Sequence, residues 1–169
     1  IPLGIFIKGN MIVTICRHEK EMFQVLANGK YRLLKTGKRY RFALYIFLET
    51  ATRYLTHLRE INRMTETIED QLQKSTRNRE VLELLKYQKS LTYFATALRS
   101  NEVMMERVQR TQIFNYYEDD QDLLEDVLTE NQQAIQMTTI TTEILSSMMD
   151  AFASIISNNL NGVMKALAA

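Results

Sequence analysis

Hydrophobic positions recur at helical spacing over most of the chain after residue 38. The final stretch, residues 121–169, has no proline and no turn signal before Asn161-Gly162. It therefore predicts one continuous helix of roughly 45 residues, about 70 Å long at 1.5 Å per residue. We expect one apolar stripe of this helix to be exposed in a monomer and to mediate self-association. The stripe consists of Leu145, Met149, Phe152, Ile156, Leu160, Val163 and Leu167.

Two further long helices are predicted before it. Apolar residues recur at helical spacing from Tyr40 to Met64, and this helix is expected to span about residues 38–74. A short polar turn separates it from a second helix of about 79–113, and such a short link makes the two helices antiparallel neighbours. The pattern breaks at residues 115–120, so the final helix is expected to start near Asp122.

The N-terminal region has a different pattern. Two short runs rich in β-branched residues flank Lys8-Gly9-Asn10, which predicts a β-hairpin. Because two strands alone are barely stable in water, we expect the hairpin to be the remnant of a larger sheet. A short helix of about residues 18–26 is expected to stop at Asn28-Gly29. The predicted fold class is α+β and predominantly α, with a domain at 1–113 and a stalk helix at 114–169.

Charge is distributed unevenly along the 169 residues, although the formal net charge is only +1. Residues 1–64 hold twelve Lys and Arg against four Asp and Glu, whereas residues 101–150 hold two against eleven. This asymmetry indicates that acidic and basic surfaces meet, within one chain or between subunits. The small net charge argues against a nucleic-acid partner, and no run of eighteen apolar residues is present to span a membrane.

Candidate catalytic chemistry is sparse. The two histidines, His18 and His57, have no cysteine or histidine at zinc-ligand spacing, and Cys16 is the one cysteine. The sequence contains no glycine-rich phosphate loop, nucleophile elbow or HExxH motif. We therefore expect a protein that is not an enzyme.

An acidic cluster lies at the predicted start of the final helix, with six carboxylates within the nine residues 118–126. One interpretation is a solvated helix start. The other is a divalent-cation site, because hard cations prefer carboxylate and water oxygens. Asp122 and Asp126 lie four residues apart and thus share one helix face, so they are the candidate metal ligands.

Carboxamides are concentrated near the end of the chain, where residues 157–167 read Ser-Asn-Asn-Leu-Asn-Gly-Val-Met-Lys-Ala-Leu. A frayed helix end would have such a composition. The segment also resembles the S-N-x-x-N-x-V-M-K-x-L segment of the CorA-type magnesium transporter family. The order of strand pair, long helix hairpin, acidic loop and stalk helix is similar to that family over the whole chain.

The resemblance implies a homopentamer with a cytoplasmic α/β funnel, two membrane helices and a Gly-Met-Asn selectivity motif. This sequence stops before that motif, so we expect a fragment on the cytoplasmic side of a protein held in the cell membrane by downstream helices. Mg²⁺ would be both the transported and the regulatory ion. The alternatives are a zinc or cobalt transporter on the same scaffold, or a soluble helical scaffold that oligomerises.

The resemblance also implies roles for individual residues. Asn161, Met164 and Leu167 match family positions that line the cytoplasmic end of the pore, where carboxamides can hold a hydrated ion. Asp150 shares the face of Asn161 and is expected to line the funnel. Asp126 matches a stalk acid that shares a regulatory divalent ion with a carboxylate of the neighbouring subunit, and that partner would lie upstream of this sequence.

Overall fold

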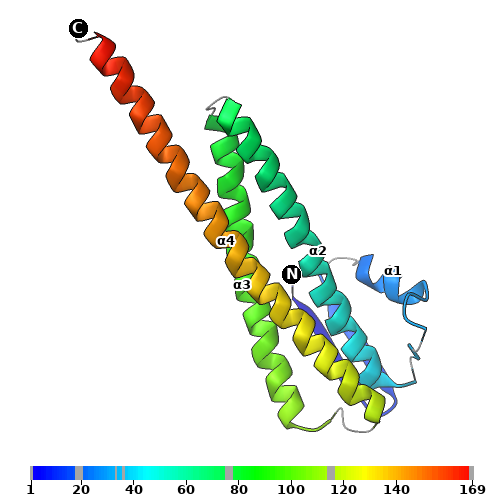
Figure 1. Ribbon diagram of the computed structural model, residues 1–169. Coiled ribbons are helices and arrows are strands. Elements are labelled where there is room, and N and C mark those ends of the chain that lie inside the picture. Colours follow the sequence, from blue (N-terminus) through cyan, green and yellow to red (C-terminus); the bar gives the residue numbers. More distant parts are fainter. Residues whose placement is uncertain are drawn as a thin grey trace. The chain divides into compact units, whose positions relative to one another are not determined.

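The computed structural model describes residues 2–17, 21–32, 34–35, 37–74, 78–113 and 117–167, apart from the side chains of 72–74, 78, 118, 159–163 and 165–167. The elements follow along these residues in the order shown in Figure 1: β1 (Leu3–Lys8), β2 (Met11–Cys16), α1 (Glu21–Ala27), α2 (Arg39–Lys74), α3 (Asn78–Arg110) and α4 (Glu118–Leu167). This is the predicted α+β and predominantly helical fold class.

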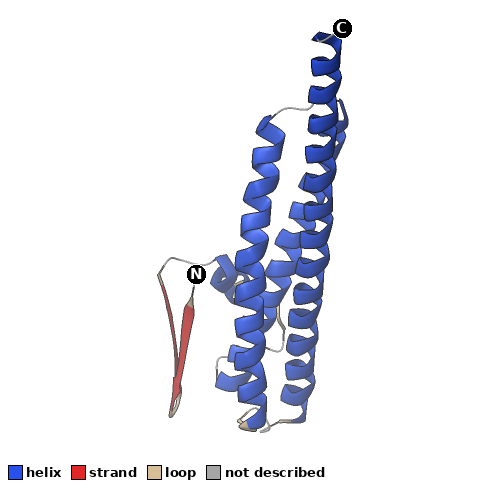
Figure 2. Cartoon of the chain, turned by 90° about the vertical axis from the view of Figure 1, so that its left-hand side faces the viewer, coloured by secondary structure: helices blue, strands red, loops and turns tan. Residues whose placement is uncertain are grey.

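β1 and β2 form the predicted antiparallel hairpin, drawn in red in Figure 2. Gly9 lies at its turn with φ of +53°, a left-handed conformation that glycine adopts without the steric cost of a side chain. One face packs on the core through Leu3, Ile5, Ile7 and Ile12. The other face leaves large apolar side chains exposed, namely Phe6, Met11, Val13 and Ile15. That the hairpin belongs to a larger sheet stays a prediction.

The chain divides into two compact units, and each draws on all three long helices. Unit 1 comprises Ile1–Tyr54 and Leu98–Gln133, and unit 2 comprises Leu55–Ala97 and Ala134–Ala169. Within each unit α2 and α3 run antiparallel, as their short link predicts (Figure 1, Figure 2). The sequence predicted a different division, with a helix-pair domain up to residue 113 and a stalk after it. That division stays a prediction.

The core of unit 1 lies where α1, α2, α3 and α4 meet the inner face of the hairpin. Its buried apolar side chains are Met22, Leu26, Ala43, Leu44, Tyr45, Ile46, Met105, Leu123, Leu124 and Val127. Burial of this many large apolar groups is the main source of stability, at about 25 cal/mol per Å² removed from water. The first turns of α2 and α4 are therefore fixed in place within this unit.

The core of unit 2 contains the first half of the apolar stripe that was expected to be exposed. Leu145 and Phe152 are buried and Met149 is partly buried, in one cluster with Ile68 of α2 and Leu84 of α3. This expectation was wrong because α2 and α3 of the same chain cover this part of α4. The remainder of the stripe is a half-buried Ile156 followed by Leu160, Val163 and Leu167, whose side chains lie outside the described residues.

The buried positions of α3 repeat every seven residues. Leu84, Leu91, Leu98 and Met105 have at most 1% of their surface exposed. On α4 the buried positions alternate by three and four residues, from Leu124 and Val127 through to Phe152. Both helices therefore use the heptad spacing of knobs-into-holes packing.

α4 is a single helix of 50 residues, longer than the predicted 45, and it continues unbroken through four threonines at 138, 139, 141 and 142. The hydroxyls of Thr138 and Thr142 donate to the carbonyl oxygens of Ala134 and Thr138, each at 2.7 Å. These back-bonds satisfy the hydroxyls inside the helix and let β-branched residues of low helix propensity be tolerated there.

The helix ends on either side of the loop between α3 and α4 differ from the predicted ones. α3 ends at Arg110 instead of residue 113, because Gln112 turns into the left-handed region with φ of 56°. α4 begins at Glu118 instead of near Asp122, and the Asp120 amide donates to the Tyr117 carbonyl oxygen at 3.0 Å. The acidic residues that were expected to lie in the preceding loop form the first helical turn, where the helix dipole favours negative charge.

We predict that Thr65→Val stabilises the fold. The Thr65 hydroxyl is buried in unit 2 and finds no hydrogen-bond partner among the described residues. A valine of the same shape removes this desolvated polar group, so the free energy of unfolding should rise by about 1 kcal/mol. Thr138→Val is the matched control, because it removes a hydroxyl that is hydrogen-bonded. Urea unfolding of both variants checks this, and equal losses of stability would contradict the prediction.

Candidate functional site

The first turn of α4 is anchored to α2 by a buried ion pair. The Arg41 side chain is 5% exposed and the Asp120 side chain 1% exposed. The Arg41 Nε–H donates to Asp120 Oδ1, and Arg41 Nη2 donates to Asp119 Oδ2 at 3.1 Å. Burial lowers the pKa of the guanidinium, but the hydrogen bond and charge of Asp120 outweigh it and leave the Arg41 pKa raised.

This pair changes the interpretation of the acidic cluster. Asp119 and Asp120 were two of its six carboxylates, and both are engaged by Arg41. Asp120 is therefore a structural residue and belongs neither to a solvated helix start nor to a cation site. Lys38 Nζ lies 4.2 Å from the centroid of the Tyr117 ring and reinforces the same corner of unit 1 through a cation–π contact.

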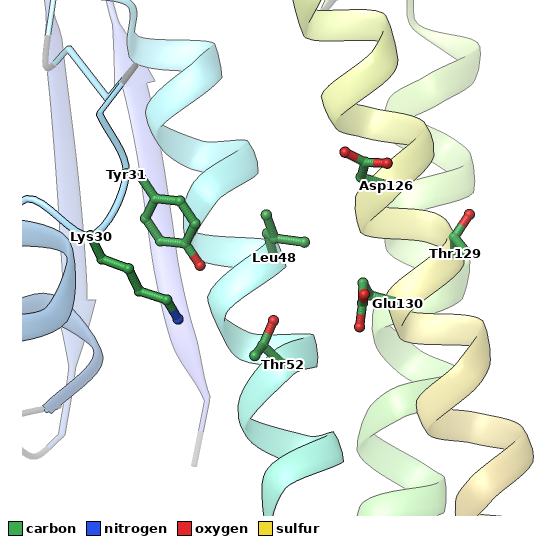
Figure 3. A pocket seen from close by; sticks show the side chains of 7 residues that line it. All are labelled: Lys30, Tyr31, Leu48, Thr52, Asp126, Thr129 and Glu130. Atoms are coloured by element: carbon green, nitrogen blue, oxygen red, sulfur yellow. The ribbon is translucent and has the colours of Figure 1, made fainter.

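A pocket of about 400 Å³ opens beside α4 in unit 1 (Figure 3). The loop after α1 and the third and fourth turns of both α2 and α4 supply its walls. The lining residues are Lys30, Tyr31, Leu48, Thr52, Asp126, Thr129 and Glu130. The pocket therefore joins an ammonium group and a phenol on one wall to two carboxylates on the other.

Glu49 fixes the positions of Lys30 and Tyr31 on their wall of the pocket. Its Oε2 accepts hydrogen bonds from Lys30 Nζ at 2.7 Å and from the Tyr31 hydroxyl at 2.9 Å, and its side chain is 4% exposed. Burial acts to raise the pKa of Glu49, but the hydrogen bonds from Lys30 and Tyr31 outweigh it, so this pKa is lowered. Burial and the bond to Glu49 raise the pKa of Tyr31, which keeps the phenol neutral.

The pocket carries a negative balance of charge. Lys30 and Arg53 are both paired, with Glu49 accepting from each and Glu21 accepting from Arg53. These two cations are thus matched by two anions, and the carboxylates of Asp126 and Glu130 remain. The electrostatics of the pocket favour a cationic ligand.

Asp126 and Glu130 fit a hydrated divalent ion. They lie one turn apart on α4, about 5–6 Å between Cβ atoms, and the hydroxyls of Thr52 and Thr129 add oxygen atoms to the same pocket. Among the described residues no group of three or more His, Cys, Asp and Glu side chains could hold a metal ion directly. Two carboxylates suit an ion that keeps most of its waters, as Mg²⁺ does.

The other predicted site residues lie at separate places. Asp122 is exposed on the same face of α4 as Asp126 but does not line the pocket. Asp150 is exposed in unit 2, and Met164 is 66% exposed near the end of α4. Asn161 and Leu167 belong to the helix, but their side chains lie outside the described residues.

Sequence reasoning missed Glu130 and the Arg41 contact. Glu130 follows Asp126 by four residues, so helical spacing alone could have added it to the candidate site. Arg41 lies three and four residues before Leu44 and Tyr45, so helical spacing could have placed it on the same side of α2 as these core residues.

The comparisons with known proteins point to one family and cover most or all of the chain. Residues 1–169 match the family model described as CorA-like Mg²⁺ transporter protein. The chain belongs to this family. It is also 31% identical, over 175 aligned residues and 98% of its length, to the cobalt/magnesium transport protein CorA of Methanocaldococcus jannaschii.

Two solved CorA structures from the same organism have the same fold. The complete magnesium transporter matches 97% of this chain with a TM-score of 0.83, and its soluble domain matches 88% with a TM-score of 0.77, each at 25% identity. This chain spans 53% of the complete transporter and 61% of the soluble-domain chain. Within the described residues, no helix is long and apolar enough to cross a membrane.

We predict that Asp120→Asn strongly destabilises this CorA-like chain. The change leaves the Arg41 charge buried without its closest partner, and breaking a buried pair in this way costs about 3–5 kcal/mol. Asp119→Asn is the matched control, because the Asp119 side chain is 74% exposed and its loss should cost less than about 1 kcal/mol. Thermal and urea unfolding measure both. Equal, small losses would show that Arg41 does not depend on Asp120.

We predict that the contribution of Glu49 to stability depends on pH. Its pKa is lower in the folded chain than the unfolded value of about 4.3, so its stabilisation is complete above that value and is lost as the pH falls through the folded pKa. Glu49→Gln should therefore cost about 1–3 kcal/mol at neutral pH, and this difference from the unmodified chain should shrink below about pH 4. Urea unfolding at several pH values tests it, and a difference that is constant with pH would contradict it.

Proposed function

We propose that this chain is the water-exposed, ion-sensing part of a divalent-cation transporter that conducts Mg²⁺ passively through a pore. The family membership supports the transporter over an enzyme or a soluble oligomerisation scaffold. The relative in Methanocaldococcus jannaschii is named a cobalt/magnesium transport protein, which makes Co²⁺ the second candidate ion. A zinc transporter on the same scaffold is the weaker alternative.

One observation carries the proposal. Residues 111–164, which include nearly all of α4, contain nine carboxylates and no lysine or arginine. Only Asp119 and Asp120 of these acids are paired with a cation within the described part of the chain. A long helix with this charge, brought beside its own copies, repels them unless cations lie between. A role in sensing and conducting divalent cations would account for the many carboxylates of this helix and its lack of lysine and arginine.

The regulatory ion is assigned to the pocket of unit 1. Asp126 and Glu130 would hold a hydrated Mg²⁺ through its waters, and a carboxylate of a neighbouring subunit would complete the site. Such a site with few protein ligands is weak, and millimolar affinity is suited to a sensor of intracellular Mg²⁺. Binding favours the closed assembly only to the extent that the ion prefers that state.

The end of α4 is assigned to the entrance of the pore. Asn161 would hold hydrated ions through its carboxamide, and Met164 and Leu167 would form an apolar constriction that closes by losing water. Asp150, which is exposed about three helical turns before Asn161, would attract cations towards the pore entrance. In this proposal five copies surround the pore, further segments anchor the protein in the cell membrane, and this part lies on the cytoplasmic side.

We predict that Asp126→Ala in the full-length protein raises the Mg²⁺ concentration needed for closure. A carboxylate and a doubly charged hydrated ion about 6 Å apart in water attract by about 1.4 kcal/mol, which corresponds to about tenfold in binding. Protease protection and ion uptake, both measured against Mg²⁺ concentration, should shift together by about this factor. Glu66→Ala, an exposed acid on α2 outside the pocket, is the matched control. If Asp126→Ala leaves both midpoints unchanged, the regulatory role of the pocket is wrong.

A further inference from the structure

The pocket of unit 1 contains a cation of its own. Among the described residues that line it, Lys30 carries the one positive charge, on the wall opposite Asp126 and Glu130 (Figure 3). Its ammonium group lies at the end of a flexible aliphatic stem, and 46% of its side-chain surface is exposed. Leu48 and Thr52, which line the pocket between the two walls, carry no charge. A lysine in this position can compete with a divalent ion for the two carboxylates.

The charge of the α4 wall acts across the pocket. Burial and Glu49 are the largest causes of the raised pKa of Tyr31, and the charge of Glu130 raises it further. Tyr31 is the chain neighbour of Lys30 and lines the same wall. Lys30 therefore also lies in the electrostatic field of Glu130, although the ion pair it forms is with Glu49.

Glu49 keeps Lys30 on its own wall. The Lys30 Nζ donates to Glu49 Oε2 at 2.7 Å, and the Glu49 side chain is buried outside the pocket lining. This carboxylate is itself fixed, because the Tyr31 hydroxyl donates to Oε2 at 2.9 Å and Arg53 Nε donates to Oε1 at 3.2 Å. Lys30 Nζ also lies 5.2 Å from the centroid of the Tyr31 ring, which adds a weaker cation–π contact.

We propose that Lys30 is a built-in competitor of the divalent ion and that Glu49 keeps the ion site open by holding this lysine. While Lys30 is paired with Glu49, the carboxylates of Asp126 and Glu130 remain available to a hydrated cation. When that pairing is lost, the ammonium group moves to the two acids and the ion must displace it. Glu49 is thus a positioning residue, which acts on the ion through Lys30. The inference rests on the proposed regulatory site and names what sets its affinity.

A double-mutant cycle in the full-length protein tests this role. The measured quantity is the Mg²⁺ concentration that gives half-maximal protease protection. Glu49→Gln should raise this midpoint by about fivefold, because the attraction between a lysine and a carboxylate about 4 Å apart in water is worth about that factor. With Lys30→Met already present, the same change should raise the midpoint by less than about twofold, because no competitor is left to release.

The cycle separates competition from two simpler effects. If Glu49 acted only through its electrostatic field, or only by supporting the fold, Glu49→Gln would shift the midpoint by the same factor with and without Lys30. Glu49→Asp is a milder second variant, which keeps the charge but shortens the side chain that holds Lys30. It should raise the midpoint by about twofold in the presence of Lys30 and leave it unchanged in the Lys30→Met background.

Arg53→Met provides the matched control background. It removes another cation that is paired with Glu49, but Arg53 does not line the pocket, so Glu49→Gln should still raise the midpoint by about fivefold there. Equal factors in the unmodified and Lys30→Met backgrounds, or no shift in either, would overturn the proposal. If Asp126→Ala shifts the midpoint while the cycle shows no coupling, only the role of Lys30 is wrong. If Asp126→Ala shifts nothing, the ion site itself is wrong.

Discussion

The constraint on which this structure depends is that α4 has almost no positive charge of its own. Every cation that balances its carboxylates comes from another element, another copy or solution. Arg41 of α2 supplies one inside unit 1, where it pairs with Asp119 and Asp120 in the first turn. The remaining acids define the proposed roles of the helix, which are an ion site at Asp126 and the attraction of cations by Asp150.

The buried side of α4 changes from apolar to polar and back along the helix. Leu124 and Val127 are buried in the core of unit 1, and Leu145, Met148 and Phe152 in the core of unit 2. The buried positions that follow each other between these two groups are Asn131, Ala134, Thr138 and Thr141. Small and polar side chains bury less apolar area, so this stretch contributes less to stability than either end. Its polar side chains are instead hydrogen-bonded, as where the Thr141 hydroxyl donates to Asn62 Oδ1 at 2.8 Å.

Periodicity predicted the elements of the fold well, and tertiary contacts decided what it could not. The hairpin, the three long helices and their order follow from spacing and turn residues that lie close together in sequence. The burial of Leu145 could not be predicted in this way, because Leu145 packs against Ile68 and Leu84, which are far away in sequence. The same holds for the site. Asp126 could be selected by resemblance and helical spacing, whereas Lys30, Tyr31 and Leu48 join its pocket only through folding.

Asp120 and Asp126 show why a carboxylate cannot be assigned a role from its sequence neighbourhood alone. They are six residues apart in the same acidic cluster, and both fit a helix start or a cation site. Asp120 faces Arg41 inside the core, where the protein supplies a permanent cation that cannot leave. Asp126 is exposed in a pocket whose lysine is already paired with Glu49. A fixed guanidinium makes the first acid structural, whereas Asp126 has no paired cation among the described residues, as the cation site proposed for it requires.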